Sequence, residues 1–319
     1  MNVLITGGTG FIGAYLTRRR LAQGDRVVIF DVAPNVKRIA DILSEVKVVQ
    51  GSLANASEVY NAVRDNGIET ILHLGAMLSS PCEASPWAAL QVNVLGTVNV
   101  LEAARLFGQP QVIYTSTIST FGLHTGTIVT DTTVQHPTTM YGCGKAFVEN
   151  LGRYYRSRFG LDFRCVRLSS VMGPGASSRQ ISQYNGIVQL PLSGRPFTCS
   201  VTPEVKVPNM YFKDAALAVD RLSAAPAEAI EMVIYNVAGI TPTPSIGDIE
   251  RAVKKVKPDA RISYEPDPKI VALSTAFKVD LFDDAFARNE WGWKPEFSSV
   301  DDVVVDFNSE LENHPDWYV

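Results

Sequence analysis

The segment Thr6–Gly13, with the sequence TGGTGFIG, decides the fold that we predict for this chain. It continues the apolar run Val3–Thr6, which has the length and composition of a buried strand. Glycines recur at every third position, Gly7, Gly10 and Gly13. Because glycine has no side chain, the backbone can turn tightly here and approach a pyrophosphate, whose charge the N-terminus of a following helix favours. The segment therefore predicts a strand, a phosphate-binding turn and a helix in succession.

Similar apolar runs alternate with helical patterns through the first half of the chain. We expect strands at Val3–Thr6, Arg26–Asp31, Lys47–Gln50, Thr70–Leu74, Gln111–Thr115 and Asp162–Leu168. We expect helices at Gly10–Gln23, Asn55–Asn66, Ala88–Phe107 and Tyr141–Phe159. Parallel neighbouring strands need crossover connections of this kind, so the pattern predicts an α/β fold with a doubly wound (Rossmann) parallel sheet.

The alternation of strand and helix patterns ends after Gly173–Gly175, and the segment Ala176–Pro208 is rich in Ser, Pro and Gly. Beyond it we expect short helices, strands and a helical tail: Ser182–Leu192, Met232–Ala238, Ile246–Lys255, Arg261–Glu265 and Phe282–Glu312. We therefore predict a dinucleotide-binding domain over residues 1–168 and a smaller α/β substrate-binding lobe over 169–319. Segments near 208–240 are expected to return to the first domain.

Composition excludes several classes of protein. The 319 residues carry a formal net charge of −4, and 46% of them are hydrophobic. We expect no nucleic-acid partner and no membrane segment, because basic residues are not in excess and no apolar stretch is long enough to span a bilayer. The four cysteines are scattered without a Cys-x-x-Cys pair, so we expect reduced thiols, no metal site and a cytoplasmic location.

Asp31 bears on the choice of cofactor. It is the last residue of the second predicted strand. Its distance along the sequence from the glycine turn is that of a carboxylate that accepts hydrogen bonds from the ribose hydroxyls of a dinucleotide. A carboxylate at this place repels a 2′-phosphate, so the sequence favours NAD over NADP. Lys37 and Arg38 follow a few residues later and are interpreted as solvated surface charges.

A tyrosine and a lysine four residues apart, Tyr141 and Lys145, fall on one face of a predicted helix. A free phenol has a pKa of about 10 and is a poor base at neutral pH. A neighbouring ammonium favours the phenolate and lowers that pKa. Ser116 and Thr117 follow a predicted strand at the carboxyl edge of the sheet, where doubly wound folds bind ligands. We expect these four residues to be catalytic.

Together these motifs resemble the extended short-chain dehydrogenase/reductases of the NAD-dependent epimerase/dehydratase superfamily. The resemblance implies that Tyr141 is the general base, that Lys145 binds the nicotinamide ribose and tunes Tyr141, and that Thr117, with Ser116 beside it, orients the substrate. It also implies a cofactor site made of Gly7, Gly10, Phe11, Ile12, Gly13, Asp31, Ser52, Leu53, Leu74, Gly75, Ala76, Asn93, Tyr141 and Lys145. The chain departs from the family pattern at Ser52, where an aspartate is usual, and at Gly75, where an alanine is usual.

Within that superfamily the chain is similar to the short-chain L-threonine 3-dehydrogenases. The similarity rests on Leu78–Glu83, Ser116–Ile118, Thr139–Gly142, Tyr154-Tyr155, Gly160–Cys165, Pro208–Tyr211 and Asn289–Trp293. It implies hydride transfer from the carbinol carbon of a small polar hydroxy acid, such as a β-hydroxy amino acid or a sugar acid. Residues expected to bind the substrate are Ser79, Ser80, Thr117, Arg179, Ser182 and Tyr184. A guanidinium at Arg179 would suit a carboxylate, although Ala176–Tyr184 departs from the glycine and threonine pattern of these dehydrogenases.

Two other functions stay open at this point. One is a nucleotide-sugar 4-epimerase or dehydratase with tightly bound NAD, and the other is a non-catalytic NAD-binding sensor. The retained Tyr141 and Lys145 disfavour the sensor. We also expect a homodimer through a four-helix bundle, in which Ala88–Phe107 and Tyr141–Phe159 expose Phe147, Leu151, Tyr154 and Tyr155.

Overall fold

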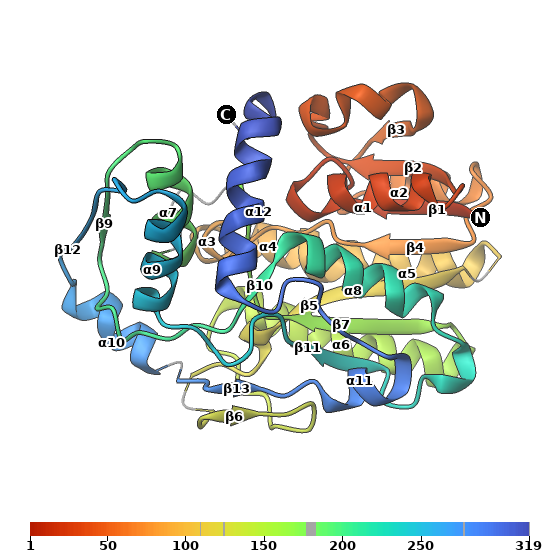
Figure 1. Ribbon diagram of the computed structural model, residues 1–319. Coiled ribbons are helices and arrows are strands. Elements are labelled where there is room, and N and C mark those ends of the chain that lie inside the picture. Colours follow the sequence, from red (N-terminus) through yellow and green to blue (C-terminus); the bar gives the residue numbers. More distant parts are fainter. Residues whose placement is uncertain (109, 124, 177–182, 277, 319) are drawn as a thin grey trace.

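A computed structural model describes residues 1–319 except 109, 124, 177–182, 277 and 319. Its centre is a seven-stranded sheet with the order β3-β2-β1-β4-β5-β7-β11, and all its strands are parallel (Figure 1). These strands are β1 (Asn2–Thr6), β2 (Arg26–Asp31), β3 (Lys47–Gln50), β4 (Thr70–His73), β5 (Gln111–Thr117), β7 (Phe163–Leu168) and β11 (Ile234–Val237). The predicted doubly wound parallel sheet is thus confirmed, with most strand boundaries within one or two residues.

Helices and short paired strands complete the chain. The helices are α1 (Phe11–Ala22), α2 (Ala56–Arg64), α3 (Ser79–Ala84), α4 (Pro86–Ala89), α5 (Gly96–Leu106), α6 (Met140–Phe159), α7 (Gln183–Leu192), α8 (Phe212–Ala224), α9 (Ile246–Val256), α10 (Pro268–Ala276), α11 (Ala285–Trp291) and α12 (Val300–Asn313). The short strands are β6 (Ile128–Val129), β8 (Ser170–Met172), β9 (Phe197–Cys199), β10 (Asn209–Tyr211), β12 (Ile262–Tyr264) and β13 (Leu281–Phe282).

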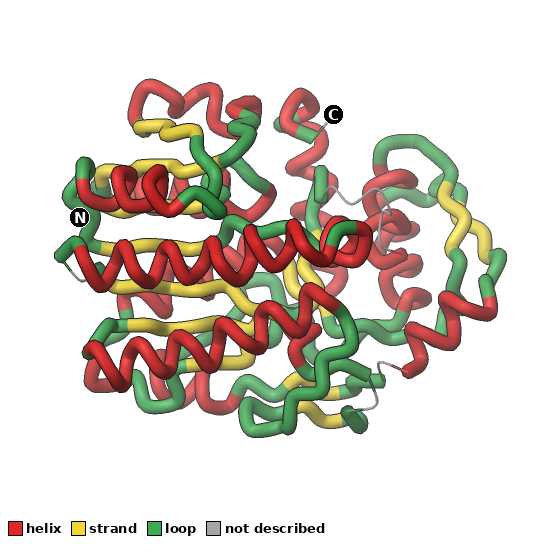
Figure 2. The backbone as a smooth tube through the Cα atoms, turned by 180° about the vertical axis from the view of Figure 1, so that it is seen from behind, coloured by secondary structure: helices red, strands yellow, loops and turns green. Residues whose placement is uncertain are grey.

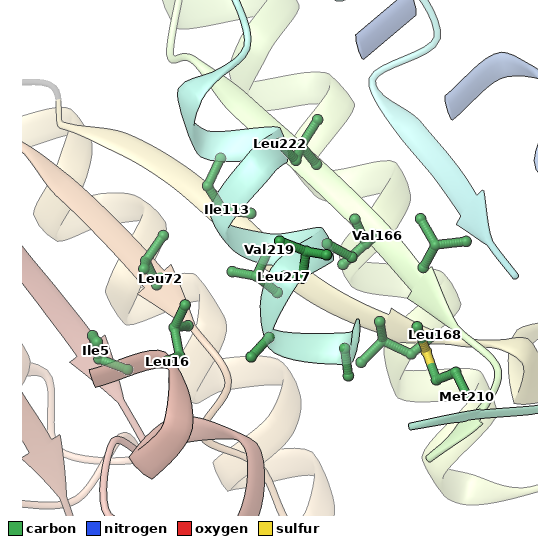
Figure 3. Packing of buried hydrophobic residues seen from close by; sticks show 14 of the residues in the cluster. Ile5, Leu16, Leu72, Ile113, Val166, Leu168, Met210, Leu217, Val219 and Leu222 are labelled. Carbon is green, nitrogen blue, oxygen red and sulfur yellow. The ribbon is translucent and has the colours of Figure 1, made fainter. Parts of the chain in front are cut away.

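Alternation of side chains along each strand builds a core on both faces of the sheet. In β1, Val3 and Ile5 join the core beneath α1, α8 and α11, which Figure 3 shows at close range. Leu4, between them, joins the core beneath α2, α5 and α6. Strands buried on both faces read as continuous apolar runs, which is why the sequence pattern located them.

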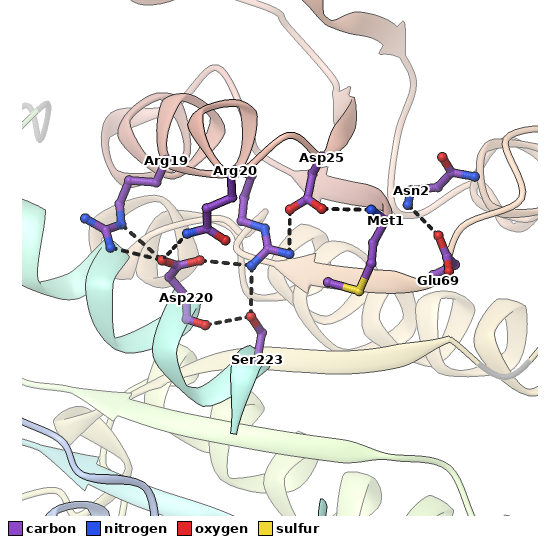
Figure 4. Close-up of polar contacts among 9 residues, drawn as sticks. Met1, Asn2, Arg19, Arg20, Asp25, Glu69, Asp220 and Ser223 are labelled. Atoms are coloured by element: carbon purple, nitrogen blue, oxygen red, sulfur yellow. Dashed lines mark hydrogen bonds and ion pairs between the residues drawn. The ribbon is translucent and has the colours of Figure 1, made fainter. Parts of the chain in front are cut away.

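The segment after β10 returns to the large sheet. Helix α8 packs against α1, and β11 pairs with β7 so that Ile234 lies beside Cys165. An ion cluster joins α1 to α8: Arg20, 2% exposed, contacts both Asp25 and Asp220, and Asp220 also accepts from Arg19 (Figure 4). The α1–α8 pair thereby ties the first and the later parts of the chain together.

A separate core lies beyond the carboxyl ends of the strands, where α7, α9 and α12 pack together with β8, β9 and β10 (Figure 1). It includes Ile187 of α7, Val253 of α9 and Phe307 of α12, all completely buried. None of the helices in the described part of the chain combines the length and apolar character needed to cross a bilayer.

The structure corrects the predicted helix Ala88–Phe107. It begins at Pro86 and consists of α4, a π-helical segment Leu90–Leu95 and α5. Within the π-helix, the Asn93 side chain accepts from the backbone N–H of Met77 at 2.7 Å and donates to its carbonyl at 2.9 Å. Single π-helical turns inside α-helices are common at functional sites, and hydrophobic periodicity does not reveal them.

Two further predictions need correction. Ser116 and Thr117 belong to β5 itself, because both pair with β7, whereas the sequence placed them after the strand. On the outer face of α5 and α6, which Figure 2 shows side by side from behind, Phe147 and Tyr154 are exposed as predicted. Tyr155 is not exposed, because its hydroxyl donates to Glu102 of α5 and its ring packs into the core.

Candidate active site

The glycine turn joins β1 to α1 and is built so tightly that side chains cannot enter it. A Cβ on Gly13 would lie 2.1 Å from the carbonyl oxygen of Gly7, and one on Gly7 would lie 3.0 Å from the Cα of Gly75. Gly7 also has a φ of 69°, which glycine adopts readily. Helix α1 begins at Phe11 without a side-chain cap, so its first N–H groups point at the turn. This arrangement fits a pyrophosphate.

Asp31 lies at the end of β2 with its carboxylate already oriented. Thr9 of the glycine turn donates to one oxygen at 2.6 Å, and the backbone N–H of Ala33 donates to the other at 3.2 Å. Arg38 is not the solvated charge that the sequence suggested. Its guanidinium donates to the carbonyls of Gly175 and Trp317, at 2.8 and 3.3 Å. Because Arg38 is engaged there, it is not free to hold a 2′-phosphate.

Tyr141 occupies the first turn of α6, whose N-cap Thr139 accepts from the N–H of Gly142 at 3.0 Å. Burial, together with the nearby Cys82, raises the pKa of the Tyr141 phenol above its usual value. A Cβ on Gly142 would lie 2.5 Å from the carbonyl oxygen of Ser119, so the start of α6 rests directly on the segment that follows Thr117. The first turn of α6, which carries Tyr141, therefore packs against the segment that follows β5.

Lys145 lies one turn further along α6 and is 3% exposed. Its Nζ donates to the carbonyl oxygen of Thr115 at 2.6 Å and lies 5.6 Å from the centre of the Tyr141 ring. Burial lowers the pKa of Lys145 to about 8, while Cys165, Cys82 and Glu149 act in the opposite direction. The ammonium is thus placed beside the phenol whose ionisation it favours.

The two hydroxyls at the end of β5 have different surroundings. The Thr117 side chain is partly exposed, and its hydroxyl accepts from the N–H of Ser119 at 3.2 Å and donates to the Ser119 hydroxyl at 3.3 Å. The Ser116 hydroxyl is 3% exposed and donates to the carboxylate of Glu149. The Ser116 hydroxyl is therefore engaged inside the protein, and Thr117 is the more accessible residue of the two.

A chain of buried hydrogen bonds runs beside the glycine turn. His73, at the end of β4, contacts Thr6 at 2.7 Å through Nδ1 and Thr97 at 3.0 Å through Nε2. Thr97 donates its only proton to the carbonyl of Asn93, so it must accept from the Nε2–H of His73. Burial and Lys145 lower the pKa of His73 to about 3, so the ring is neutral. His73 therefore has a structural role, because its neutral ring joins Thr6 to Thr97 inside the protein.

The remaining predicted residues lie around this centre or outside the described part. Gly75 donates its N–H to Thr6 at 2.9 Å, next to Leu74 and Ala76, and Ser52 donates its N–H to Glu58 at 2.7 Å, with Leu53 buried beside it. Ser79 and Ser80 are exposed at the start of α3, and Tyr184 is partly buried in α7. Arg179 and Ser182 lie outside the described residues.

Two residues of the site did not emerge from the sequence. Thr9 orients Asp31, and its position inside the glycine motif was a usable signal. Glu149 accepts from Ser116, and its position one helical turn after Lys145 was a second usable signal in the sequence. Neither interaction can be inferred from spacing alone, because the partner of each side chain belongs to another element.

A tight glycine turn, an oriented carboxylate at the end of β2, a threonine at the end of β5 and a Tyr-Lys pair on α6 are features expected of a dinucleotide-dependent enzyme. Residues 3–238 match the NAD dependent epimerase/dehydratase family, and the chain belongs to it. This confirms the resemblance to extended short-chain dehydrogenase/reductases.

Among its relatives are L-threonine 3-dehydrogenases. The chain is 31% identical over 316 residues to the mitochondrial L-threonine 3-dehydrogenase of Bos taurus, with 96% of this chain and 82% of that protein covered. The L-threonine dehydrogenase structure from Phytophthora infestans superposes with a TM-score of 0.87 at 32% identity, covering 98% and 99% of the two chains. The holo form of a GalE-like L-threonine dehydrogenase from Cupriavidus necator superposes with a TM-score of 0.86 at 30% identity, and the superposition covers 98% of this chain and 100% of that chain.

Proposed function

We propose that this chain is an NAD-dependent dehydrogenase that oxidises the secondary alcohol of a small hydroxy acid, with L-threonine-like β-hydroxy amino acids as the first class to test. The observation that carries the proposal is the placement of the Lys145 ammonium between the end of β5 and the Tyr141 ring. The similarity to L-threonine 3-dehydrogenases supports the substrate class.

The residues supply a route for the alcohol proton. Thr117 holds the substrate oxygen at the end of β5, and Tyr141 in its phenolate form takes the proton from that oxygen. The Lys145 ammonium stabilises the Tyr141 phenolate, which burial alone would destabilise. NAD, held by the glycine turn and Asp31, supplies the hydride acceptor.

Several features support NAD as the cofactor. The turn at Gly7 and Gly13 leaves room for a pyrophosphate only because both positions lack a side chain. Asp31, oriented by Thr9, suits a ribose diol and repels a 2′-phosphate. The engagement of Arg38 with Gly175 and Trp317 adds to this preference.

The test is NADH formation by the purified protein with NAD and L-threonine, other β-hydroxy acids, aldonic acids and nucleotide sugars. We expect turnover of one hydroxy acid, and its loss in Tyr141→Phe with NAD affinity retained. If a nucleotide sugar is epimerised without net NADH, the proposal is wrong and the chain is a sugar epimerase with recycled cofactor.

The substrate is expected to lie between the dinucleotide-binding part, residues 1–168 with α8 and β11, and the lobe of residues 169–319. We also propose a homodimer. Phe147 and Tyr154 are 54% and 53% exposed on the outer face of α6, where they are available to pack against the same helix of a second copy.

A further inference from the structure

Glu149 is a carboxylate buried beside the proposed active centre but with no part in the reaction described so far. It is 1% exposed and lies on α6, four residues after Lys145 and eight after Tyr141. Residues at these spacings lie close to one face of a helix. Glu149 therefore faces the same side of the sheet as the two proposed catalytic residues.

Every contact of this carboxylate reaches another element. Arg167 of β7 donates to both oxygens, with distances of 3.0 and 2.8 Å, and Gln135 donates to one at 2.7 Å. Ser116 of β5 donates its hydroxyl to the other. Burying such a pair costs desolvation that apolar side chains of similar size would avoid, so stability alone does not explain it.

Three successive residues at the end of β5 divide the contacts with α6. The carbonyl of Thr115 accepts from Lys145, the hydroxyl of Ser116 donates to Glu149, and Thr117 carries the hydroxyl proposed to hold the substrate oxygen. Lys145 and Glu149 thus attach one helix to the two residues that directly precede Thr117. A displacement of either contact would move Thr117 relative to Tyr141.

Glu149 also carries the charge that favours an ammonium at this place. Lys145 is faced by His73 of β4, Tyr114 of β5, Cys165 of β7, Cys82 of α3, and Tyr141 and Glu149 of its own helix. Of these, His73 is neutral and the thiols and phenols are ordinarily protonated, so the carboxylate provides the fixed negative charge.

The surroundings of Glu149 itself are equally defined. It is faced by Arg167 and Cys165 of β7, by Tyr114 and Ser116 of β5, and by Lys145. Asp131, whose backbone carbonyl accepts from Arg167 at 3.1 Å, lies on the far side of that guanidinium. The Glu149–Arg167 pair is therefore closed to solvent.

We propose that Glu149 is a positioning residue of this active site, which holds the end of β5 against α6 and keeps Lys145 in its ammonium form, and through Lys145 sets the ionisation of Tyr141. The inference rests on the proposed roles of Tyr141 and Lys145. It does not depend on which alcohol is the substrate.

The test is an ultraviolet titration of the Tyr141 phenolate in the NAD-saturated protein, with the same protein carrying Tyr141→Phe subtracted. In Glu149→Gln we expect the titration to move to higher pH by about one unit, because Lys145 loses its anionic neighbour and protonates less readily. Glu149→Asp keeps the charge and is expected to titrate closer to the native protein.

Asp220→Asn is the matched control, since Asp220 forms an equally buried ion pair with Arg20 far from Tyr141. We expect it to lower the Tm and leave the titration unchanged. If Glu149→Gln behaves in the same way, Glu149 is structural only and the proposal is wrong.

Should Glu149→Gln fail to fold, Ser116→Ala takes its place. It should lower kcat at least tenfold with KM little changed, and an unchanged kcat would overturn the positioning role.

The titration also separates this inference from the proposed function. If the titration shifts in Glu149→Gln but the protein oxidises no alcohol, the proposed dehydrogenase activity is wrong and the role of Glu149 stands. If the protein oxidises an alcohol in a reaction that depends on Tyr141 but the titration does not shift, the dehydrogenase activity stands and the role of Glu149 is wrong.

Discussion

The Nζ atom of Lys145 lies 2.6 Å from the carbonyl oxygen of Thr115, two residues before Thr117 in β5. This contact places the ammonium within a buried region where water cannot compete for it. It also satisfies a carbonyl at the point where the strand ends. Burial of this lysine lowers its pKa to about 8.

The pH dependence of activity should report this lysine. Because Lys145 must carry its proton to favour the Tyr141 phenolate, we expect kcat/KM for the substrate to fall as pH rises through about 8. The measurement is a steady-state profile across neutral and alkaline pH. In Lys145→Met the same limb should be absent and kcat lower by about 100-fold or more. A limb that persists in that variant would assign it to another group.

Gly13→Ala should abolish NAD binding. Its Cβ would lie 2.1 Å from the carbonyl oxygen of Gly7, which the turn cannot accommodate without moving away from the pyrophosphate. Gly10→Ala is the control, because there the nearest atom would be at 3.0 Å and a small shift relieves it. Calorimetric titration with NAD should show a far larger loss for Gly13→Ala. Equal losses would argue against a close approach at Gly13.

Asp31→Ser should lower NAD affinity by about tenfold to a hundredfold, because it removes a charged acceptor for the ribose hydroxyls. The same change removes the repulsion of a 2′-phosphate. It should nevertheless give no efficient use of NADP, since Arg38 remains bound to Gly175 and Trp317. Kd values for both cofactors check this. Tight NADP binding by the single variant would mean that Arg38 leaves these partners readily.

Asp131→Asn should stabilise the protein at neutral pH. Burial raises the pKa of Asp131 to about 6 in the folded state, so folding disfavours its charged form. The folded state then holds the proton more tightly than the unfolded chain, and the penalty grows from about pH 4 to pH 6 and is constant above that. We expect a gain of up to about 3 kcal/mol at pH 7.5 that disappears near pH 4. Urea unfolding at both pH values measures it, and a gain at both would refute the assignment.

Phe147→Glu should convert the proposed dimer to single chains. The ring is 54% exposed in the middle of α6, and a charge there would be buried without a partner in a four-helix interface. Val305→Glu on α12, where the native side chain is 59% exposed, introduces the same charge on another surface and should leave the mass unchanged. Sedimentation equilibrium distinguishes the two. A native protein with the mass of one chain would exclude the dimer.

Local patterns were enough to predict much of this protein. The apolar runs of β1, β2 and β4, the glycine spacing of Thr6–Gly13 and the four-residue step from Tyr141 to Lys145 all depend on neighbours in the chain. Such features are set by backbone sterics and by the periods of strands and helices, which the order of residues specifies directly. The class of enzyme followed from them.

Tertiary packing decided which side chains meet. Asp31 and Thr9 are 22 residues apart, Lys145 and Thr115 are 30 apart, and Ser116 and Glu149 are 33 apart. The first contact exists because β1 lies next to β2, and the other two exist because β5 lies beneath α6, arrangements that no local pattern contains. The same packing turned Tyr155 inward, wound Leu90–Leu95 into a π-helix and directed Ser116 away from Thr117. The sequence by itself determined the elements and the reactive groups, and the packing of those elements determined each group's hydrogen-bond partners and its exposure.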